Sequence, residues 1–421
     1  MKVYKFGGAS IKDANGVRNI KNVLNELQAN NVLVVISAMG KMTNAFEGIV
    51  DAYFNDKDIL SSKLDVVKEY HNSILKQLFD DEKYSIFNDV NLLWINLSGF
   101  LIKNNRIDYS YAYDQIVSVA EQVSTKIISA YLNNNDIKNT WINAKDYIKT
   151  DNTYREGKVD WKATEENIKK LANYQEIIIT QGFIASDMNN NAITLGREGS
   201  DYSAAIFAYC LNASSVTVFK DVAGVLNADP RLYDDTKLLT KISYREAIEM
   251  AFYGASVIHP KTLQPLQQKE IPLYVKSFIN PLEKGTTIGK GIDLEPKTPC
   301  YIVKDNQILI SISTRDFSFM MENNISEIFE MLHRFKLKVN LIQNTAISFS
   351  VCLEDKYRTF DEFLHVLKIN YKGLYNEDTT LFTIRHFDTK VVEKINKENE
   401  ILLQQTSRET VQFVVKTIKK S

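Results

Sequence analysis

The sequence predicts an α/β protein: a mostly parallel sheet with helices on both faces, followed by a ferredoxin-like βαββαβ region. Strand-like and helical patterns alternate over residues 1–280, which is typical of parallel sheets. Beyond residue 300 the elements are short and repeat the order strand, helix, strand, strand. Between them, residues 284–299 are rich in Gly and Pro, which indicates an exposed boundary. We therefore expect two domains, residues 1–290 and residues 301–421.

The first elements form one β-α-β unit. Residues 3–6 predict a strand, helical spacing of apolar residues begins at Val17, and residues 31–37 predict a buried strand. Residues 42–133 are mostly helical in pattern. Further strands are expected at 176–184, 191–195, 215–219 and 271–278, and we expect the strand at 271–278 to be the last of this series. Helices are expected at 201–211 and after a capping box of Ser243 and Glu246.

Composition excludes several classes of protein. The chain has 421 residues, 44% hydrophobic and 24% charged, with a net charge of −1, so neither a disordered chain nor a nucleic-acid or membrane partner is indicated. Its three cysteines are widely spaced, which fits unpaired thiols in a reducing compartment. The amino terminus lacks the pattern of a signal peptide, and we expect a cytoplasmic protein with small-molecule partners.

The stretch KFGGAS (5–10) follows the first strand. Glycines let backbone amides approach an anion closely, and a strand, a glycine turn and a helix are the layout of a phosphate cradle. The motif is neither a Walker loop nor a dinucleotide fingerprint. From these residues alone, a purely structural turn remains an open alternative.

Two further segments carry candidate polar groups. In LGREGSDYSAA (195–205), Arg197 is suited to bidentate capture of a carboxylate or phosphate, whereas Ser200 and Asp201 also fit a helix N-cap. Glu121 lies at the edge of the apolar stripe of helix 111–129, where it can reach a cation or simply extend to solvent. His259 precedes Pro260, and we expect it to cap a helix or lie in the core.

In their order and spacing, these stretches resemble the aspartate kinases of the amino acid kinase family. The matching motifs are KFGGAS (5–10), SAMGKMTN (37–44), AEQ (120–122), TQGF (180–183), LGREGSDYSAA (195–205), KDVAGVLNADPR (220–231), YREAIEMAFYGASVIHPKT (244–262) and VKSFINPLEKGTTI (275–288). The resemblance implies an α/β sandwich that transfers the ATP γ-phosphate to the β-carboxylate of L-aspartate, with Mg²⁺, followed by ACT regulatory domains.

The resemblance also implies roles for single residues. Lys5 and Asp201 match catalytic positions, Asp201 orienting Lys5. The positions expected to bind aspartate are Thr43, Glu121, Phe183, Arg197 and Ser200. The positions expected on the nucleotide side are Lys5, Gly7, Gly8, Ser10, Ser37, Lys220, Asp221, Leu226, Arg231 and Ser256. No residue is expected to form a dedicated metal site.

This chain departs from the family pattern at three nucleotide-side positions. Ala9 stands where a Thr is usual, Lys220 where a Thr is usual, and Ser256 where relatives have a lysine that contacts the phosphates. Losing a cation at Ser256 is expected to weaken ATP binding, unless Lys220 restores the charge.

Residues 310–351 resemble a first ACT domain, and the rest of the carboxyl-terminal region resembles a shortened second one. This resemblance implies a homodimer and an amino-acid effector, with Asp316, Glu322, Asn323 and Asn340 as candidate partners. Asn340 lies where relatives often have an aspartate, so we expect lysine to be a poor effector or to act through contacts unlike those of lysine-sensitive relatives.

Three hypotheses follow. The first is an aspartate kinase that opens the route to lysine, methionine and threonine. The second is a catalytically weak amino-acid sensor with a kinase fold, favoured by Ala9 and Ser256. The third is a kinase for another acidic amino acid, which the fold alone does not exclude.

Overall fold

A computed structural model describes residues 1–255, 258–316 and 318–416, and the chain divides into two compact units. Unit 1 comprises Met1–Val225, Leu238–Ile248 and Val257–Pro296. Unit 2 comprises Leu226–Lys237, Glu249–Ser256 and Lys297–Ser421. Two short segments within the first 260 residues thus belong to the unit that contains the carboxyl-terminal sheet.

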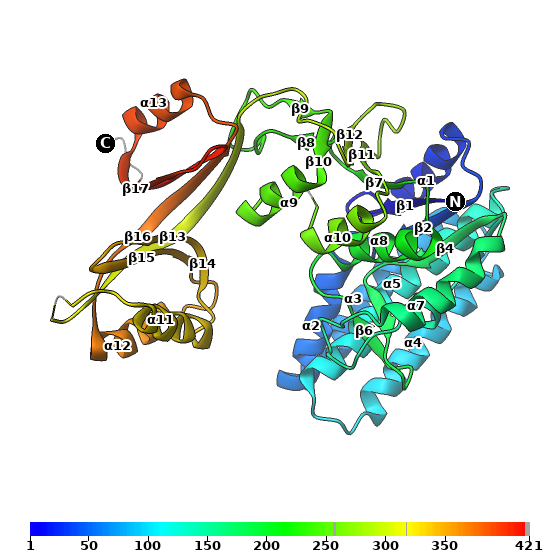
Figure 1. The fold of residues 1–421 in the computed structure, drawn as a ribbon. Coiled ribbons are helices and arrows are strands. Elements are labelled where there is room, and N and C mark those ends of the chain that lie inside the picture. The colour runs from blue at the N-terminus through cyan, green and yellow to red at the C-terminus, as the bar shows by residue number, and fades with distance from the viewer. Residues whose placement is uncertain (256–257, 317, 417–421) are drawn as a thin grey trace. The chain divides into compact units, whose positions relative to one another are not determined.

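The main sheet of unit 1 has eight strands in the order β10-β12-β11-β7-β1-β2-β4-β3 (Figure 1). Its strands are β1 (Lys2–Phe6), β2 (Val32–Ile36), β3 (Asn139–Trp141), β4 (Ile177–Gln181), β7 (Val216–Lys220), β10 (Lys241–Ser243), β11 (Leu273–Ser277) and β12 (Thr286–Gly289). All neighbours are parallel except β11 and β12. The predicted parallel sheet is therefore confirmed.

Strand β12 corrects one prediction. Residues 286–289 lie in the segment expected to be an exposed boundary, and strand 271–278 was expected to end the series. Instead, β12 pairs antiparallel with β11, an arrangement for which a short turn is sufficient. Buried Thr286 secures it, since its hydroxyl donates to the Leu239 carbonyl and accepts from the Val225 N–H.

Helices cover both faces of this sheet. The helices of unit 1 are α1 (Ala14–Glu26), α2 (Met42–Asn55), α3 (Leu60–Leu78), α4 (Ser85–Lys103), α5 (Tyr109–Asn134), α6 (Ala144–Tyr147), α7 (Trp161–Ile168), α8 (Gly199–Leu211) and α10 (Pro260–Gln268). Helix α9 (Tyr244–Tyr253) begins in unit 1 and ends in unit 2. Helices α1–α5 share one apolar core with strands β1, β2 and β4, which includes Phe6, Val34 and Ile179. Helix α8 contacts β1, β2 and β7, and α7 and α10 pack against it.

Shorter elements complete unit 1 and its connections. They are the antiparallel pair β5 (Ile184–Ser186) and β6 (Ala192–Thr194), the strands β8 (Val225–Leu226) and β9 (Leu238–Leu239), and 3-10 turns at Lys57–Ile59 and Lys169–Asn173. His259 caps α10, since its ring nitrogen accepts from the Lys261 N–H, as the sequence predicted.

Unit 2 contains a six-stranded antiparallel sheet in the order β14-β15-β13-β16-β18-β17. Its elements in sequence are β13 (Cys300–Thr314), α11 (Glu322–Arg334), β14 (Lys338–Asn344), β15 (Ser348–Glu354), α12 (Phe360–Asn370), β16 (Tyr371–Arg385), α13 (Thr389–Glu398), β17 (Glu400–Thr406) and β18 (Thr410–Lys416). The first six elements form the predicted βαββαβ unit. The shortened second unit shares the long strands β13 and β16, which pair along most of their length.

Candidate active site

Lys5 lies near the carboxyl end of the central strand β1. Side chains alternate along a strand, so Tyr4 and Phe6 enter the core with α1–α5 while Lys5 lies on the face covered by α8. The glycine turn follows directly. A Cβ at Gly8 would lie 2.5 Å from the Ala38 carbonyl oxygen, so only glycine fits where the turn crosses the loop after β2.

Asp201 connects Lys5 to the neighbouring strand. It lies in the first turn of α8, is 4% exposed, and its carboxylate is 2.7 Å from Lys5 Nζ and 3.9 Å from Lys220 Nζ. Burial works to raise the pKa of Asp201, but the two lysines outweigh burial and hold that pKa below its usual value. Because β1 and β7 are parallel neighbours, Lys5 and Lys220 reach the same carboxylate.

Glu121 lies on α5 and is 2% exposed, so of its two alternatives the one in which it extends to solvent is wrong. Burial raises the pKa of Glu121 to about 8, although Lys5 and the Ala38 N–H work to lower it. Its Oε2 atom has no hydrogen-bond partner among the described residues. A buried carboxylate oxygen without a partner costs free energy unless a cationic ligand approaches it.

The loop before α8 brings further candidates together. A Cβ at Gly182 would lie 2.5 Å from Ser200 Cβ, and a Cβ at Gly199 would lie 2.6 Å from the Phe183 ring. Phe183 is held with φ of 68°, and its N–H donates to the Ser203 hydroxyl. Segments 180–183 and 195–201 therefore pack as one surface.

Arg197 is exposed in that loop, next to Glu198, which adopts a left-handed φ of 54°. Sequence reasoning missed Asp114, a fully buried residue of α5 that helps to hold this region. Its carboxylate accepts from the Thr194 hydroxyl at 2.6 Å and from the backbone N–H groups of Thr194 and Arg155. Burial raises the pKa of Asp114 to about 6. The signal was an acid within the apolar stripe of a helix.

The remaining unit 1 candidates occupy the loops after the strands. Thr43 is half-buried in the first turn of α2, and Asp221 is exposed directly after β7. The Ser37 carbonyl accepts from the Ser124 hydroxyl, and the Ser10 N–H closes the turn by donating to the Gly7 carbonyl. These loops lie at the carboxyl ends of β1, β2 and β7, where open α/β sheets bind ligands.

Three nucleotide-side candidates fall outside this arrangement. Leu226 and Arg231 belong to unit 2, where the exposed Arg231 guanidinium pairs with Asp229 at 2.5 Å. Ser256 lies outside the described residues. The positions of these three residues relative to Lys5 stay predictions.

The resulting constellation is suited to moving an anionic group. Lys5 and Lys220 supply positive charge, and the adjoining glycine turn supplies backbone N–H groups. Buried Glu121 supplies an acceptor for a cation. Positive charge held at fixed positions in a buried site lowers the barrier to reactions in which two anions must approach each other.

Comparisons with known proteins agree with this chemistry. The amino acid kinase family profile matches residues 1–277. Lysine-sensitive aspartokinase 3 of Escherichia coli is 31% identical to this chain, over 84% of this chain and 78% of that protein. The chain spans 35% to 48% of the length of four bifunctional aspartokinase/homoserine dehydrogenases. Among these, the Buchnera aphidicola protein is 29% identical over 89% of this chain and 48% of its own length.

Solved structures extend the similarity to both units. E. coli aspartokinase III in complex with lysine and aspartate, in the T-state, superposes with a TM-score of 0.82 and 26% identity, covering 99% of this chain and 96% of that one. Aspartokinase III in complex with aspartate and ADP, in the R-state, gives a TM-score of 0.80 with the same identity and coverage.

Proposed function

Because the chain belongs to the amino acid kinase family and, within it, to the aspartokinases, we propose that it transfers the γ-phosphate of ATP to the β-carboxylate of L-aspartate. The product would be 4-phospho-L-aspartate, the first intermediate toward lysine, methionine and threonine. The observation that carries the proposal is the buried Glu121 carboxylate, whose free oxygen lies within the electrostatic influence of Lys5. A substrate ammonium would satisfy that oxygen.

The reaction needs little acid–base chemistry from the protein. A carboxylate nucleophile is ionised at neutral pH, so no general base is required. The barrier is the approach of two anions, which positioning and fixed positive charge lower. Lys5, held by Asp201 at 2.7 Å, is placed to stabilise the charge of the transferred phosphoryl group.

Substrate recognition would use both ends of aspartate. Arg197 would bind the α-carboxylate in a bidentate manner and Glu121 the ammonium. Thr43, Phe183 and Ser200 would complete the pocket. The packing of 180–183 against 195–201 supports this, because it places two of these three residues on one surface.

The nucleotide would lie against the glycine turn and the loops after β2 and β7. We assign Lys5, Gly7, Gly8, Ser10, Ser37, Lys220, Asp221, Leu226, Arg231 and Ser256 to this side. The 3.9 Å contact of Lys220 with Asp201 supports a cation near the phosphates that offsets the serine at position 256.

Mg²⁺ fits this site as an ion carried mainly by the phosphates. Among the described residues, no group of three or more His, Cys, Asp or Glu side chains could hold a metal. Magnesium commonly binds one or two carboxylates together with substrate phosphates, so such a group is not required. When bound, it would neutralise phosphate charge, with Asp201 beside Lys5 and Asp221 directly after β7 as candidate carboxylates.

We further assign catalysis to residues 1–290 and regulation to residues 301–421, with an amino-acid effector at the ACT region of a cytoplasmic homodimer. The antiparallel sheet of unit 2 ends in edge strands β14 and β17, which are open to pairing with a second copy. The weak-sensor hypothesis is not favoured, because Lys5, Glu121 and Asp201 are all present and buried.

The decisive experiment traps acyl phosphate with hydroxylamine. Aspartate, glutamate and acetylglutamate are supplied in turn with Mg-ATP, and the hydroxamate is measured. Aspartate alone is expected to give product, and Glu121→Gln should lower that yield by weakening aspartate binding. Product from glutamate or acetylglutamate in preference to aspartate would refute the assigned substrate.

A further inference from the structure

Helix α4 presents an apolar stripe that the fold does not cover. Leu92, Ile95 and Ile102 are 55%, 56% and 82% exposed, respectively. A Cβ added at Gly99 would meet no other heavy atom within 4 Å. Gly99 and these three residues lie three, four and three positions apart along the helix. That spacing is the narrow seam of a coiled coil, in which the first and fourth residues of each heptad meet a partner helix.

The opposite face of α4 shows that this helix does not cross a membrane. By length and composition it could, with a mean hydropathy of 1.2 and only 22% of that stretch buried. However, Val90, Trp94 and Leu97 pack into the core of unit 1. A membrane-spanning helix is surrounded by lipid or by other spanning segments. This face of α4 packs instead against the core of unit 1.

We propose that the seam Leu92–Ile102 pairs with the same seam of a second copy, in antiparallel orientation about a two-fold axis. In that register Leu92 meets Ile102 of the second copy, and Ile95 fills the space above its Gly99. Every apolar residue of the seam then finds a partner, and the glycine lets the two helices approach closely. A parallel pairing would instead leave Gly99 facing Gly99.

Charge complementarity supports the same register. Asp89, Asn96 and Lys103 lie seven residues apart, along one flank of the seam. In antiparallel coiled coils this flank faces its own copy, so Asp89 would meet Lys103 of the second copy at both ends. Asn96 would lie beside the axis, facing its own counterpart. Each copy of α4 thus carries one acid, Asp89, and one lysine, Lys103, near opposite ends, and this pattern is self-complementary.

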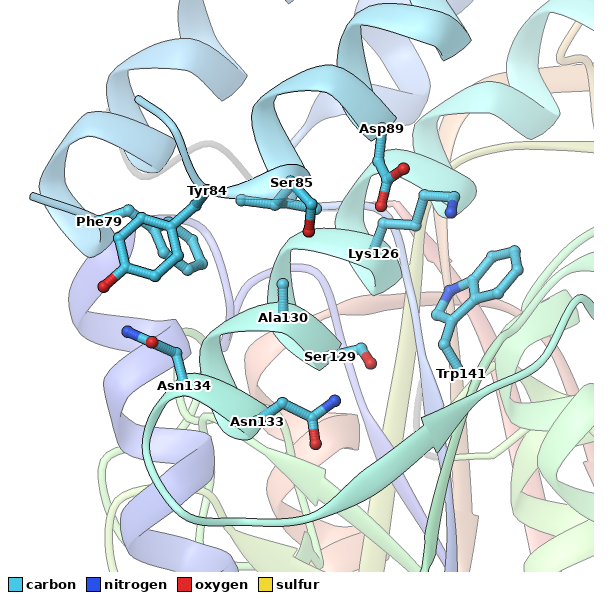
Figure 2. A pocket seen from close by; sticks show the side chains of 11 residues that line it. Phe79, Tyr84, Ser85, Asp89, Lys126, Ser129, Ala130, Asn133, Asn134 and Trp141 are labelled. Atoms are coloured by element: carbon cyan, nitrogen blue, oxygen red, sulfur yellow. The ribbon is translucent and has the colours of Figure 1, made fainter. Parts of the chain in front are cut away.

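The surface next to α4 has room for a partner on this flank. A cavity of about 650 Å³ is lined by Ile95, Asn96, Gly99 and Lys103. A second one, of about 440 Å³, includes Asp89 (Figure 2). Figure 2 shows the Asp89 carboxylate on the side of Lys126, whose Nζ atom lies 4.3 Å from the centre of the Trp141 ring. The Asp89 carboxylate thus lies on the flank of α4 next to Lys126, and in the proposed pair the same flank would bring it near Lys103 of the second copy.

Site-directed crosslinking tests the pairing in the full-length chain. Asn96→Cys is treated with a short bis-maleimide, with Asn91→Cys as the control on the same helix; the natural cysteines described are all buried. In the proposed register two copies of residue 96 are offset by about 3 Å along the axis and two copies of residue 91 by about 18 Å. We expect crosslinked pairs from Asn96→Cys only. Equal yields from the two variants would overturn the proposal.

Substitutions in the seam add a second test. Ile95→Asp in the Asn96→Cys background should lower the yield by about tenfold or more, since the charge would be buried, whereas Asn91→Asp should leave it within about twofold. Asp89→Lys should lower the yield, and adding Lys103→Asp should restore it. Failure of that restoration would overturn the antiparallel register. Ile95-dependent flotation with phosphatidylglycerol vesicles, without crosslinking, would overturn the second copy in favour of a lipid surface.

Discussion

Two lysines, the buried Lys5 of unit 1 and the half-buried Lys304 of unit 2, show how the partner of a lysine decides its charge environment. Lys5 on β1 pairs with the Asp201 carboxylate at 2.7 Å. Lys304 on β13 donates instead to the neutral Asn340 amide, its Nζ lying 2.8 Å from Oδ1. Asn340 in turn donates to Gln307 at 2.7 Å, so both ends of this amide are engaged within unit 2.

The difference appears in the charge balance. Burial, followed by the neighbouring Lys338, lowers the pKa of Lys304 to about 8, because the amide supplies no negative charge. At Lys5 a full carboxylate faces the ammonium, and the same cation holds the pKa of Asp201 below its usual value. A carboxylate partner thus places a negative charge beside the lysine ammonium, whereas an amide partner leaves Lys304 with a pKa of about 8.

The largest effect is expected from removing the ammonium group of Lys5. Lys5→Ala should lower kcat by about 100-fold or more, the usual cost of removing an electrostatic group that acts on the transition state. Steady-state kinetics measure the loss, and Lys2→Ala, an exposed lysine on the same strand, is the matched control. Near-normal turnover of Lys5→Ala would remove this lysine from the catalytic machinery.

Arg197→Ala tests whether an exposed cation, outside the buried Lys5–Asp201 pair, contributes to aspartate binding. Losing a charge-assisted bidentate contact should raise the KM for aspartate by about 10- to 100-fold, with a smaller effect on the KM for ATP. Arg197→Lys should be intermediate, because it keeps the charge but not the fork. An equal change in both Michaelis constants would contradict the assignment to aspartate.

The pH dependence of aspartate binding tests the proposed role of Glu121. Its folded-state pKa, about 8, is raised, so its contribution to stability is present at low pH and is lost as pH rises through 8. Aspartate binding has the opposite effect on Glu121, because the ammonium of aspartate favours the ionised form of the Glu121 carboxyl group. The Kd for aspartate should fall by up to about tenfold per pH unit from pH 6 to 8 and then level off.

Calorimetry in buffers of different ionisation enthalpy would detect the proton released on aspartate binding. Glu121→Gln should bind aspartate more weakly and lose this release. Proton release that persists in the variant would assign the titration to another group.

The smallest effect concerns Asn340→Asp, which makes the Lys304 pair resemble that of Lys5. The folded-state pKa of Lys304 is depressed, so the stability linked to this group rises as pH increases from about 8 toward 10.5. An aspartate at 340 should raise stability at pH 7 by roughly 1 kcal/mol after allowance for solvent screening, and should flatten that rise. Urea unfolding at pH 7 and pH 10 measures both.

The same substitution tests the regulatory prediction. With its amide oxygen engaged by Lys304, Asn340 offers an external lysine less than an aspartate would. We expect weak inhibition by lysine in the kinase assay, and tighter inhibition after Asn340→Asp. Inhibition of the natural chain at low micromolar lysine, unaffected by Asn340→Ala, would show that the effector binds elsewhere.

Local patterns in the sequence were sufficient for the main elements of the fold. Short apolar runs located β1, β2 and β7, a helical pattern located α8, and the alternation of strands with helices predicted the parallel sheet. The motif segments 5–10, 37–44 and 220–231 begin at the carboxyl ends of β1, β2 and β7, and the structure brings Lys5, Lys220 and Asp201 into contact. These features depend on neighbours close in the chain or on adjacent strands.

By itself, then, the sequence determined the order of the main elements and the family, and it supplied the candidate residues that we propose for phosphate, because each is written in short contiguous stretches. Only the tertiary structure decided the burial of Glu121, the contacts of Asp114 with Thr194 80 residues away, and the engagement of Asn340 by Lys304 36 residues away. It also placed β12 in a segment whose composition predicted a linker. In each case the partner comes from a distant segment, and a residue's own neighbours in sequence do not reveal which charge or hydrogen-bonding group will face it after folding.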